Sequence, residues 1–234
     1  MATGSDSGIV QRPDESEKAS SNSDAALRAS GTWLAMGAGL LALALIFHGP
    51  PSPSIAEQMQ IIAEGTARWS IVHWTAATSL SCFAVSGLIV LTSGSRLTGD
   101  WTTISAWAVL VVGALWTMTT AVAEATAVAH AAASNNRELF EAWWKFAEGK
   151  GNGFVFLALA VAVIASTEAS SADGATPTWA AWVGTAAAVI SPLGWALGLW
   201  IGIGIGGPIW VASSLVMCVW LLWLGVALAR EKAG

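Results

Sequence analysis

A single glutamate lies inside an alanine- and valine-rich stretch, AVAEATAVAHAAASNN (121–136), that is apolar enough to lie within a membrane. An ionised carboxylate in hydrocarbon is costly, so Glu124 is a candidate functional residue by default. Thr117 and Thr120 precede it by seven and four residues, which places all three on one face of a helix. This polar stripe predicts a helix face that points to the protein interior or to a wet cavity.

The chain has three histidines, and all of them are expected at one face of the membrane. His48 ends the first apolar segment, His73 lies near the start of the second, and His130 follows the third. Because successive spans alternate in direction, these positions fall on the same side, and Glu124 reaches about the same depth. His130 lies roughly 9 Å further along its helix. We predict that Glu124 and His73 approach each other within the bundle.

Imidazole and carboxylate groups gathered in this way could bind zinc, iron or copper, and two histidines could hold a haem axially. The candidate metal ligands, and the threonines that complete the predicted polar site, are His48, His73, His130, Glu124, Thr117 and Thr120. No HExxH or other metal-ligand spacing occurs within one helix. The same groups therefore also fit a proton-linked step, or hydrogen bonds at a wet interface.

The composition places these residues in a membrane protein. The chain is 55% hydrophobic and 11% charged, whereas a soluble domain carries about 25% charged residues. Six apolar segments approach the ~20 residues that a helix needs to cross a bilayer. They cover Thr32–Phe47, Ser70–Thr92, Trp101–Ala129, Gly153–Ser166, Thr178–Ile203 and Ile209–Ala229. We predict an all-α polytopic integral membrane protein, with six transmembrane helices in residues 31–232, in a prokaryotic cell membrane.

The first thirty residues differ from the rest of the chain. Acidic and basic residues are set there among serine, alanine and glycine, without a signal-peptide pattern, which predicts a retained, disordered acidic tail over residues 1–30. Lysine and arginine near the span ends favour the side that holds both termini. The positive-inside rule then places both termini in the cytoplasm and the histidines at the outer face.

Two connections are expected to form short interfacial helices. Ser54 followed by Glu57 resembles a helix-capping pattern, and apolar residues after it share one face. The second connection, RELFEAWWKF (137–146), presents a broad aromatic face beside charged residues. The alternative for both is an ordinary loop helix packed over the bundle.

The fifth span carries glycines at intervals of four. Such small-xxx-small spacing favours close helix packing, and the predicted ridge consists of Gly194, Gly198, Gly202 and Gly206. Pro192 should bend this helix. Tryptophans near the span ends are typical of the aromatic belts of membrane proteins, and they include Trp33, Trp69, Trp101, Trp179, Trp182, Trp200 and Trp210.

Several function classes are excluded. The four lysines lie outside the spans, so a retinal Schiff base is ruled out, and neither GxSxG nor GK[ST] occurs. No basic cluster indicates nucleic acid. The leading hypothesis is a non-enzymatic membrane protein whose outer polar site binds a metal or haem, or takes part in a proton-linked step. The alternatives are a small-solute transporter or channel, and a structural or assembly subunit. The expected partners are the lipid bilayer and either a second copy of the chain or another membrane subunit.

Overall fold

The computed structural model describes residues 15–49, 52, 54–148 and 150–231, and every regular element in these ranges is a helix. The long helices are α1 (Glu15–His48), α3 (Thr66–Ser93), α4 (Trp101–Ala123), α7 (Lys150–Ser170), α8 (Thr178–Trp195) and α9 (Gly206–Ala229). Within the described ranges, six stretches are long and apolar enough to cross a membrane, one for each of these helices. The predicted all-α polytopic architecture is therefore confirmed.

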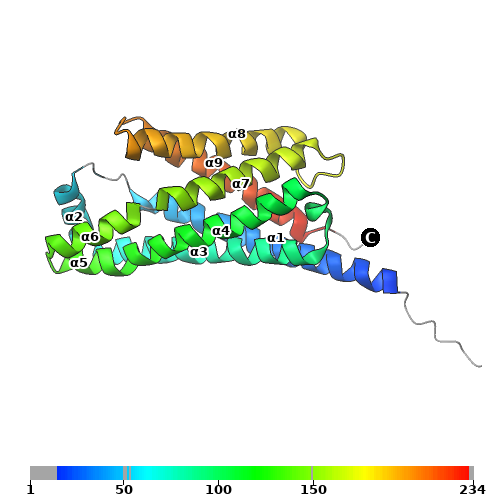
Figure 1. The fold of residues 1–234 in the computed structure, drawn as a ribbon, viewed down its shortest axis with the longest axis horizontal. Helices are drawn as coiled ribbons and strands as arrows, with labels where there is room; N and C mark the ends of the chain where they lie inside the picture. The colour runs from blue at the N-terminus through cyan, green and yellow to red at the C-terminus, as the bar shows by residue number, and fades with distance from the viewer. Residues whose placement is uncertain (1–14, 50–51, 53, 149, 232–234) are drawn as a thin grey trace, which may run out of the picture.

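Shorter elements cap the two ends of the bundle. α4 continues through a π-helical turn, η2 (Glu124–Val128), into α5 (Ala129–Ala133), and α8 continues into a second π-helical turn, η3 (Ala196–Trp200). The remaining elements are α2 (Ile55–Glu64), η1 (Arg96–Thr98) and α6 (Arg137–Glu148). Figure 1 shows α2, α5 and α6 together at one end, which we call the site end, while α1 begins and α9 ends at the opposite, terminal end.

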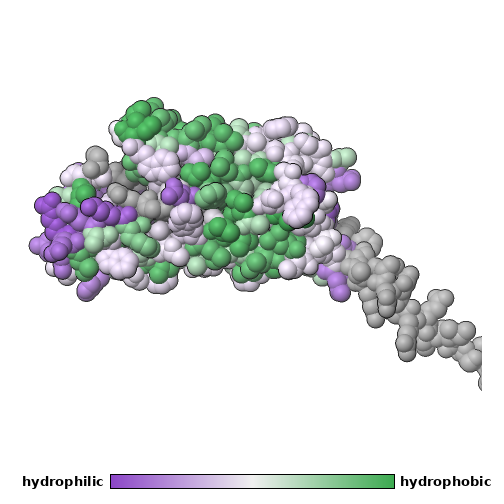
Figure 2. Space-filling view, viewed as in Figure 1, coloured by the Kyte–Doolittle hydropathy of each residue, from purple (hydrophilic) through white to green (hydrophobic). Residues whose placement is uncertain are grey.

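The long helices form a closed ring. α1 packs between α3 and α9, and the order continues from α3 through α4, α7 and α8 back to α9. Glycines bring neighbours into close approach: a Cβ atom at Gly113 of α4 would lie 2.5 Å from the backbone nitrogen of Leu157 of α7. Figure 2 shows apolar residues over the middle of the bundle and hydrophilic residues over the site end, as contact with lipid requires.

The terminal end is held by an ion pair between the partly exposed Arg96 and the buried Glu168, which the sequence pattern did not indicate. Arg96 donates to the carboxylate of Glu168 over 3.0 Å, and that carboxylate also accepts from the backbone N–H of Ala175 over 2.8 Å. Glu168 is buried, so this network joins the α3–α4 connection to the α7–α8 connection. It lies at the other end of the bundle from the histidines.

The predicted disordered tail was wrong over residues 15–30, because α1 begins at Glu15; residues 1–14 lie outside the described ranges. Small side chains in this part of α1 allow close packing. Ser30 and Ser86 lie 2.9 Å apart through their hydroxyl groups. Gly31 and Gly225 lie so close that a Cβ atom on either would meet the facing backbone. Tertiary contact thus stabilises a segment whose composition alone favours disorder.

The predicted glycine ridge was wrong in its extent. The helix formed by α8 and η3 ends at Trp200, and Gly202 has a φ of +80°, which a right-handed helix does not permit. Gly206 therefore begins α9 and does not extend α8, but it packs closely as predicted, since a Cβ atom there would lie 2.5 Å from Cα of Gly198. Gly194 and Gly198 do face α9: Cβ atoms there would lie 2.5 Å from the nitrogen of Trp210 and 2.7 Å from that of Gly207. Gly202 and Gly204, which alternate with isoleucine, weaken the helix where it ends.

The two short helices at the site end pack over the bundle. Ser54 accepts a hydrogen bond from the Glu57 backbone at the start of α2, as the capping pattern predicted. Ile62 of α2 and Phe140 of α6 are fully buried against the end of α4 and α5. Trp143 and Phe146 of α6 remain exposed. The structure therefore supports packing over the bundle, with an apolar surface left available for a membrane interface.

Candidate metal centre

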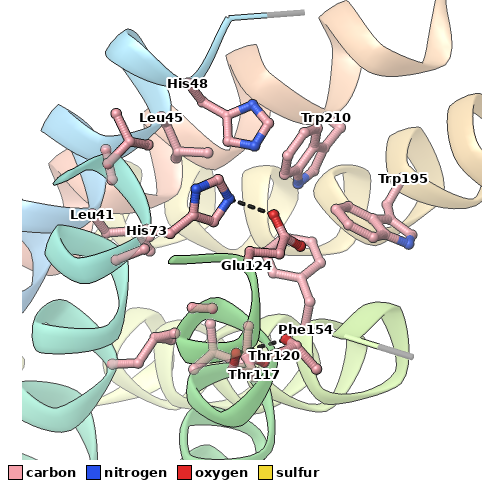
Figure 3. Close-up of a pocket in the computed structure, with 16 residues that line it drawn as sticks. Leu41, Leu45, His48, His73, Thr117, Thr120, Glu124, Phe154, Trp195 and Trp210 are labelled. Carbon is pink, nitrogen blue, oxygen red and sulfur yellow. Dashed lines mark hydrogen bonds and ion pairs between the residues drawn. The ribbon is translucent and has the colours of Figure 1, made fainter. Parts of the chain in front are cut away.

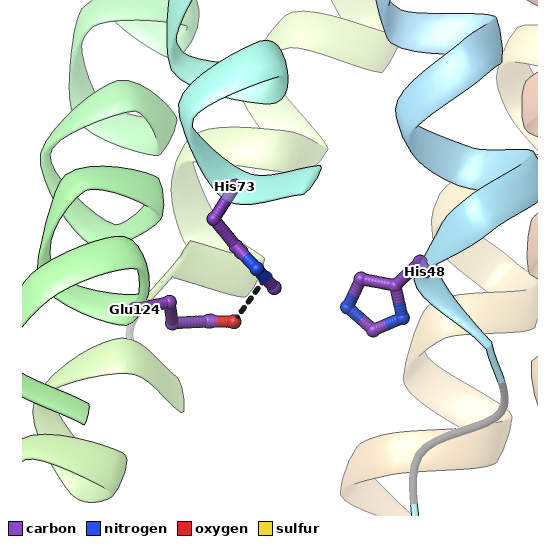
Figure 4. Close-up of side chains that lie close together, drawn as sticks. All are labelled: His48, His73 and Glu124. Atoms are coloured by element: carbon purple, nitrogen blue, oxygen red, sulfur yellow. Dashed lines mark ion pairs between the residues drawn. The ribbon is translucent and has the colours of Figure 1, made fainter. Parts of the chain in front are cut away.

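Three polar side chains from three different helices meet inside the site end of the bundle. His48 is the last residue of α1, His73 lies in the second turn of α3, and Glu124 begins the π-helical turn after α4. Nε2 of His73 lies 2.5 Å from Oε2 of Glu124. One ligand atom from each of the three residues lies within 4.8 Å of the others (Figure 4). The predicted approach of His73 and Glu124 is confirmed.

Local backbone features set the direction of each side chain. Gly49 has a φ of +77°, a left-handed conformation that ends α1 directly after His48. His73 is held from the preceding turn, because its Nδ1 donates to the carbonyl of Trp69 over 2.9 Å. The π-helical turn that starts at Glu124 widens the backbone there, and such turns often occur at functional sites.

Hydrogen bonds assign the ring nitrogens of both histidines. A carbonyl oxygen can only accept, so Nδ1 of His48 donates to the carbonyl of Gly49 over 2.8 Å, just as Nδ1 of His73 donates to Trp69. This leaves Nε2 of each ring for the interior of the cluster, and Figure 4 shows a nitrogen of His48 on the side of His73 and Glu124. Two lone pairs repel at 2.5 Å, so in this arrangement a proton must lie between His73 and Glu124.

Because the cluster is buried, the charge of its carboxylate must be balanced within the protein. The Glu124 side chain is fully buried and that of His73 is 6% exposed. A buried carboxylate is stable only when it is paired or coordinates a cation, because it has lost its hydration. The cluster must therefore hold positive charge or a shared proton.

Tryptophans surround the cluster. The ring centroid of Trp69 lies 4.3 Å from that of His73 and 5.1 Å from that of His48. The ring centroid of Trp210 lies 6.4 Å from that of His48. Both indoles are buried, at 3% and 8% exposure. Assigning these two residues to an aromatic belt was therefore wrong, although Trp33, Trp101, Trp179, Trp182 and Trp200 are exposed. A usable signal was the spacing of four residues between Trp69 and His73.

A cavity of about 90 Å³ adjoins the cluster, and each of the six long helices or its continuation contributes to its wall (Figure 3). The wall is mostly aliphatic and aromatic. Thr117 and Thr120 line it, as the polar stripe predicted, and their hydroxyls donate to the backbone carbonyls of Gly113 and Thr117. Both threonine hydroxyl groups thus lie beside the cavity and donate their protons to the backbone of their own helix.

His130 does not join the cluster. It lies in α5, beyond the π-helical turn, and its side chain is exposed. Glu124 points into the bundle, whereas His130 lies six residues further along and on another face of the helix. Including His130 among the candidate ligands was therefore wrong.

These features define a class: an all-α membrane protein of six spans, with a buried histidine–carboxylate cluster at one end of its helical ring. No protein-family model, curated protein or solved structure matches the chain.

Proposed function

We propose that this protein binds a divalent transition-metal ion in the membrane, through His48, His73 and Glu124. The observation that supports it most strongly is the convergence of three donor groups, from three separate helices, within 4.8 Å. Each donor is oriented by its own helix. A bound cation would also offset the charge of the buried Glu124 carboxylate.

The donor set suits this proposal. Two imidazoles and one carboxylate form known sites for zinc and non-haem iron, with positions left for water or another ligand. Histidines that bind metals through one nitrogen usually donate the other N–H to a carbonyl or carboxylate. His48 and His73 both have this arrangement, through Gly49 and Trp69.

The dimensions favour a single ion over haem. Ligand atoms about 2.0–2.2 Å from a tetrahedral metal lie about 3.4 Å apart. Metal binding would therefore require Nε2 of His73 and Oε2 of Glu124 to separate by about 1 Å from their present 2.5 Å, and the widest spacing of 4.8 Å to shorten by little more than 1 Å. The adjoining cavity of about 90 Å³ is large enough for several water molecules. It is small beside typical pockets for organic ligands, which measure ~300–1,000 Å³.

Metal analysis of the full-length protein tests this function. The purified protein in detergent, dialysed against zinc, iron(II) or copper with a competing chelator, is expected to retain about one ion per chain. His48→Gln, His73→Gln and Glu124→Gln should each reduce affinity at least tenfold, because each removes one of three protein ligands.

Two matched variants serve as controls for the metal analysis. His130→Gln changes an exposed histidine, and Glu168→Gln changes a buried carboxylate at the opposite end of the bundle. Both should retain the ion. Equal metal content in the cluster variants and these controls would contradict the proposal.

A proton-linked step in a transporter or channel is the second candidate, because His73 and Glu124 lie close enough to share a proton. A structural or assembly subunit would need neither a metal nor a proton. Wild-type protein that binds no metal, yet moves protons into liposomes in a manner that depends on Glu124, would favour the transporter over the metal site.

We further propose that the site end faces the exterior of the cell and that both termini are cytoplasmic. Cys82 and Cys218 are buried, so cysteines introduced at Ser134 and Ala172, both exposed, should dominate labelling. An impermeant maleimide should label Ser134→Cys in intact cells, and Ala172→Cys only after permeabilisation. The reverse pattern would place the cluster at the cytoplasmic face.

A further inference from the structure

The indole N–H of Trp210 donates no hydrogen bond to the described part of the protein. Trp210 is 8% exposed, lines the cavity, and its Nε1 is buried without a hydrogen-bond partner. Figure 3 shows its ring beside His48, with the nitrogen directed toward the Glu124 carboxylate. A buried donor left unsatisfied costs about 1–3 kcal/mol. This position therefore suits an oxygen atom of a bound molecule, next to the metal ligands.

The rest of the cavity is apolar and extends toward the middle of the bundle. Leu41, Leu80 and Thr117 line it, and each lies seven residues inward from a member of the cluster. Seven residues of helix correspond to roughly 10 Å. Leu157 and Phe154 of α7 complete this inner part. The cavity thus has a polar head at the cluster and an aliphatic interior.

The charge at the cluster limits which kind of chemical group the polar end of the cavity can bind. A divalent ion together with the Glu124 carboxylate retains one positive charge, provided that both histidines are neutral. An anionic oxygen ligand would neutralise that charge in a site shielded from bulk solvent. The indole N–H of Trp210 would then donate to the same oxygen ligand.

We propose that the site binds a small monocarboxylate with a short aliphatic chain, its oxygen on the metal and Trp210, and its chain among Leu41, Leu80 and Leu157. This inference rests on the metal site proposed above. It deepens that function by naming a ligand class and by assigning Trp210 as the residue that positions the head group.

The test uses cobalt(II) as a coloured ion in the full-length protein, titrated with acetate, propionate and butyrate. The visible spectrum should change on binding, because an oxygen ligand enters the coordination sphere. Each added methylene should tighten binding about fourfold, the equivalent of ~0.8 kcal/mol.

Two sets of variants test the binding of the ligand's carboxylate and the binding of its aliphatic chain separately. Trp210→Phe should weaken all three carboxylates by about tenfold, while cobalt binding persists. Trp195→Phe is its control, since Trp195 lines the same cavity but Figure 3 shows its nitrogen directed away from the cluster. Leu80→Phe should remove the gain with chain length and leave acetate binding unchanged. Leu41→Phe is a second filling variant, at a partly buried position that tolerates a larger side chain more readily.

The outcomes distinguish the two proposals. If wild-type protein binds no cobalt, the metal site itself is wrong. If cobalt binds but its spectrum does not change when carboxylates are added, the metal site stands and the ligand inference is overturned. The same conclusion follows if carboxylate affinity does not depend on chain length. Equal effects of Trp210→Phe and Trp195→Phe would also overturn it, by removing the specific role of the Trp210 N–H.

Discussion

Replacing His73 by glutamine is expected to lower the free energy of unfolding by about 3–5 kcal/mol, because it breaks a buried pair by removing the imidazole from the Glu124 carboxylate. Glu124 is fully buried and lies 2.5 Å from His73, so the pair is shielded from bulk solvent. Unfolding in mixed micelles by a denaturing detergent, with a chelator present throughout, measures this change without a contribution from bound metal.

A double-mutant cycle isolates the interaction. Glu124→Gln removes the carboxylate, so the double variant should be more stable than the sum of the two single changes predicts, by roughly 0.5–3 kcal/mol. His130→Gln, an exposed histidine on α5, should change stability by less than about 0.5 kcal/mol. Additive effects of the two cluster variants would show that the pair contributes no coupling in the folded protein.

Gly198→Leu is expected to destabilise the protein by about 3 kcal/mol, the upper end of the usual cost of overpacking. A Cβ atom at this position would lie 2.7 Å from the backbone nitrogen of Gly207, and backbone cannot rotate away as a side chain can. α9 would have to move away from α8. The same unfolding measurement reports the change.

Gly39→Leu is the matched control, because this glycine lies within α1 and a Cβ atom there would meet nothing within 4 Å. Leucine has the better helix propensity, so this variant should be as stable as the wild type or slightly more so. An unchanged unfolding midpoint in Gly198→Leu would mean that α8 and α9 do not pack as closely as described.

Residue types and their spacing along the chain were enough to predict the six spans and the depth of the polar residues. Hydrocarbon requires about twenty apolar residues per helix, and the helical rise converts residue number into depth. Counting from the ends of the spans therefore predicted that His73 and Glu124 lie at one level, and they form an ion pair. The capping residue of α2 was also predictable, because a cap depends only on neighbours in the sequence.

Depth does not specify rotation about a helix axis, and tertiary structure decided which residues at one level meet. His48 and His130 both belong to the site end, yet only His48 faces the cluster. Trp69 and Trp210 carried the same pattern as the exposed tryptophans, but packing places them around the histidines. Ring closure also stabilises helix α1 at residues that the sequence assigned to the tail or to its edge, since Ser30 and Gly31 pack against α3 and α9. Contacts between distant segments of the chain set these features; among them, only the contact of Trp69 with His73 follows from a local spacing, that of four residues along one helix.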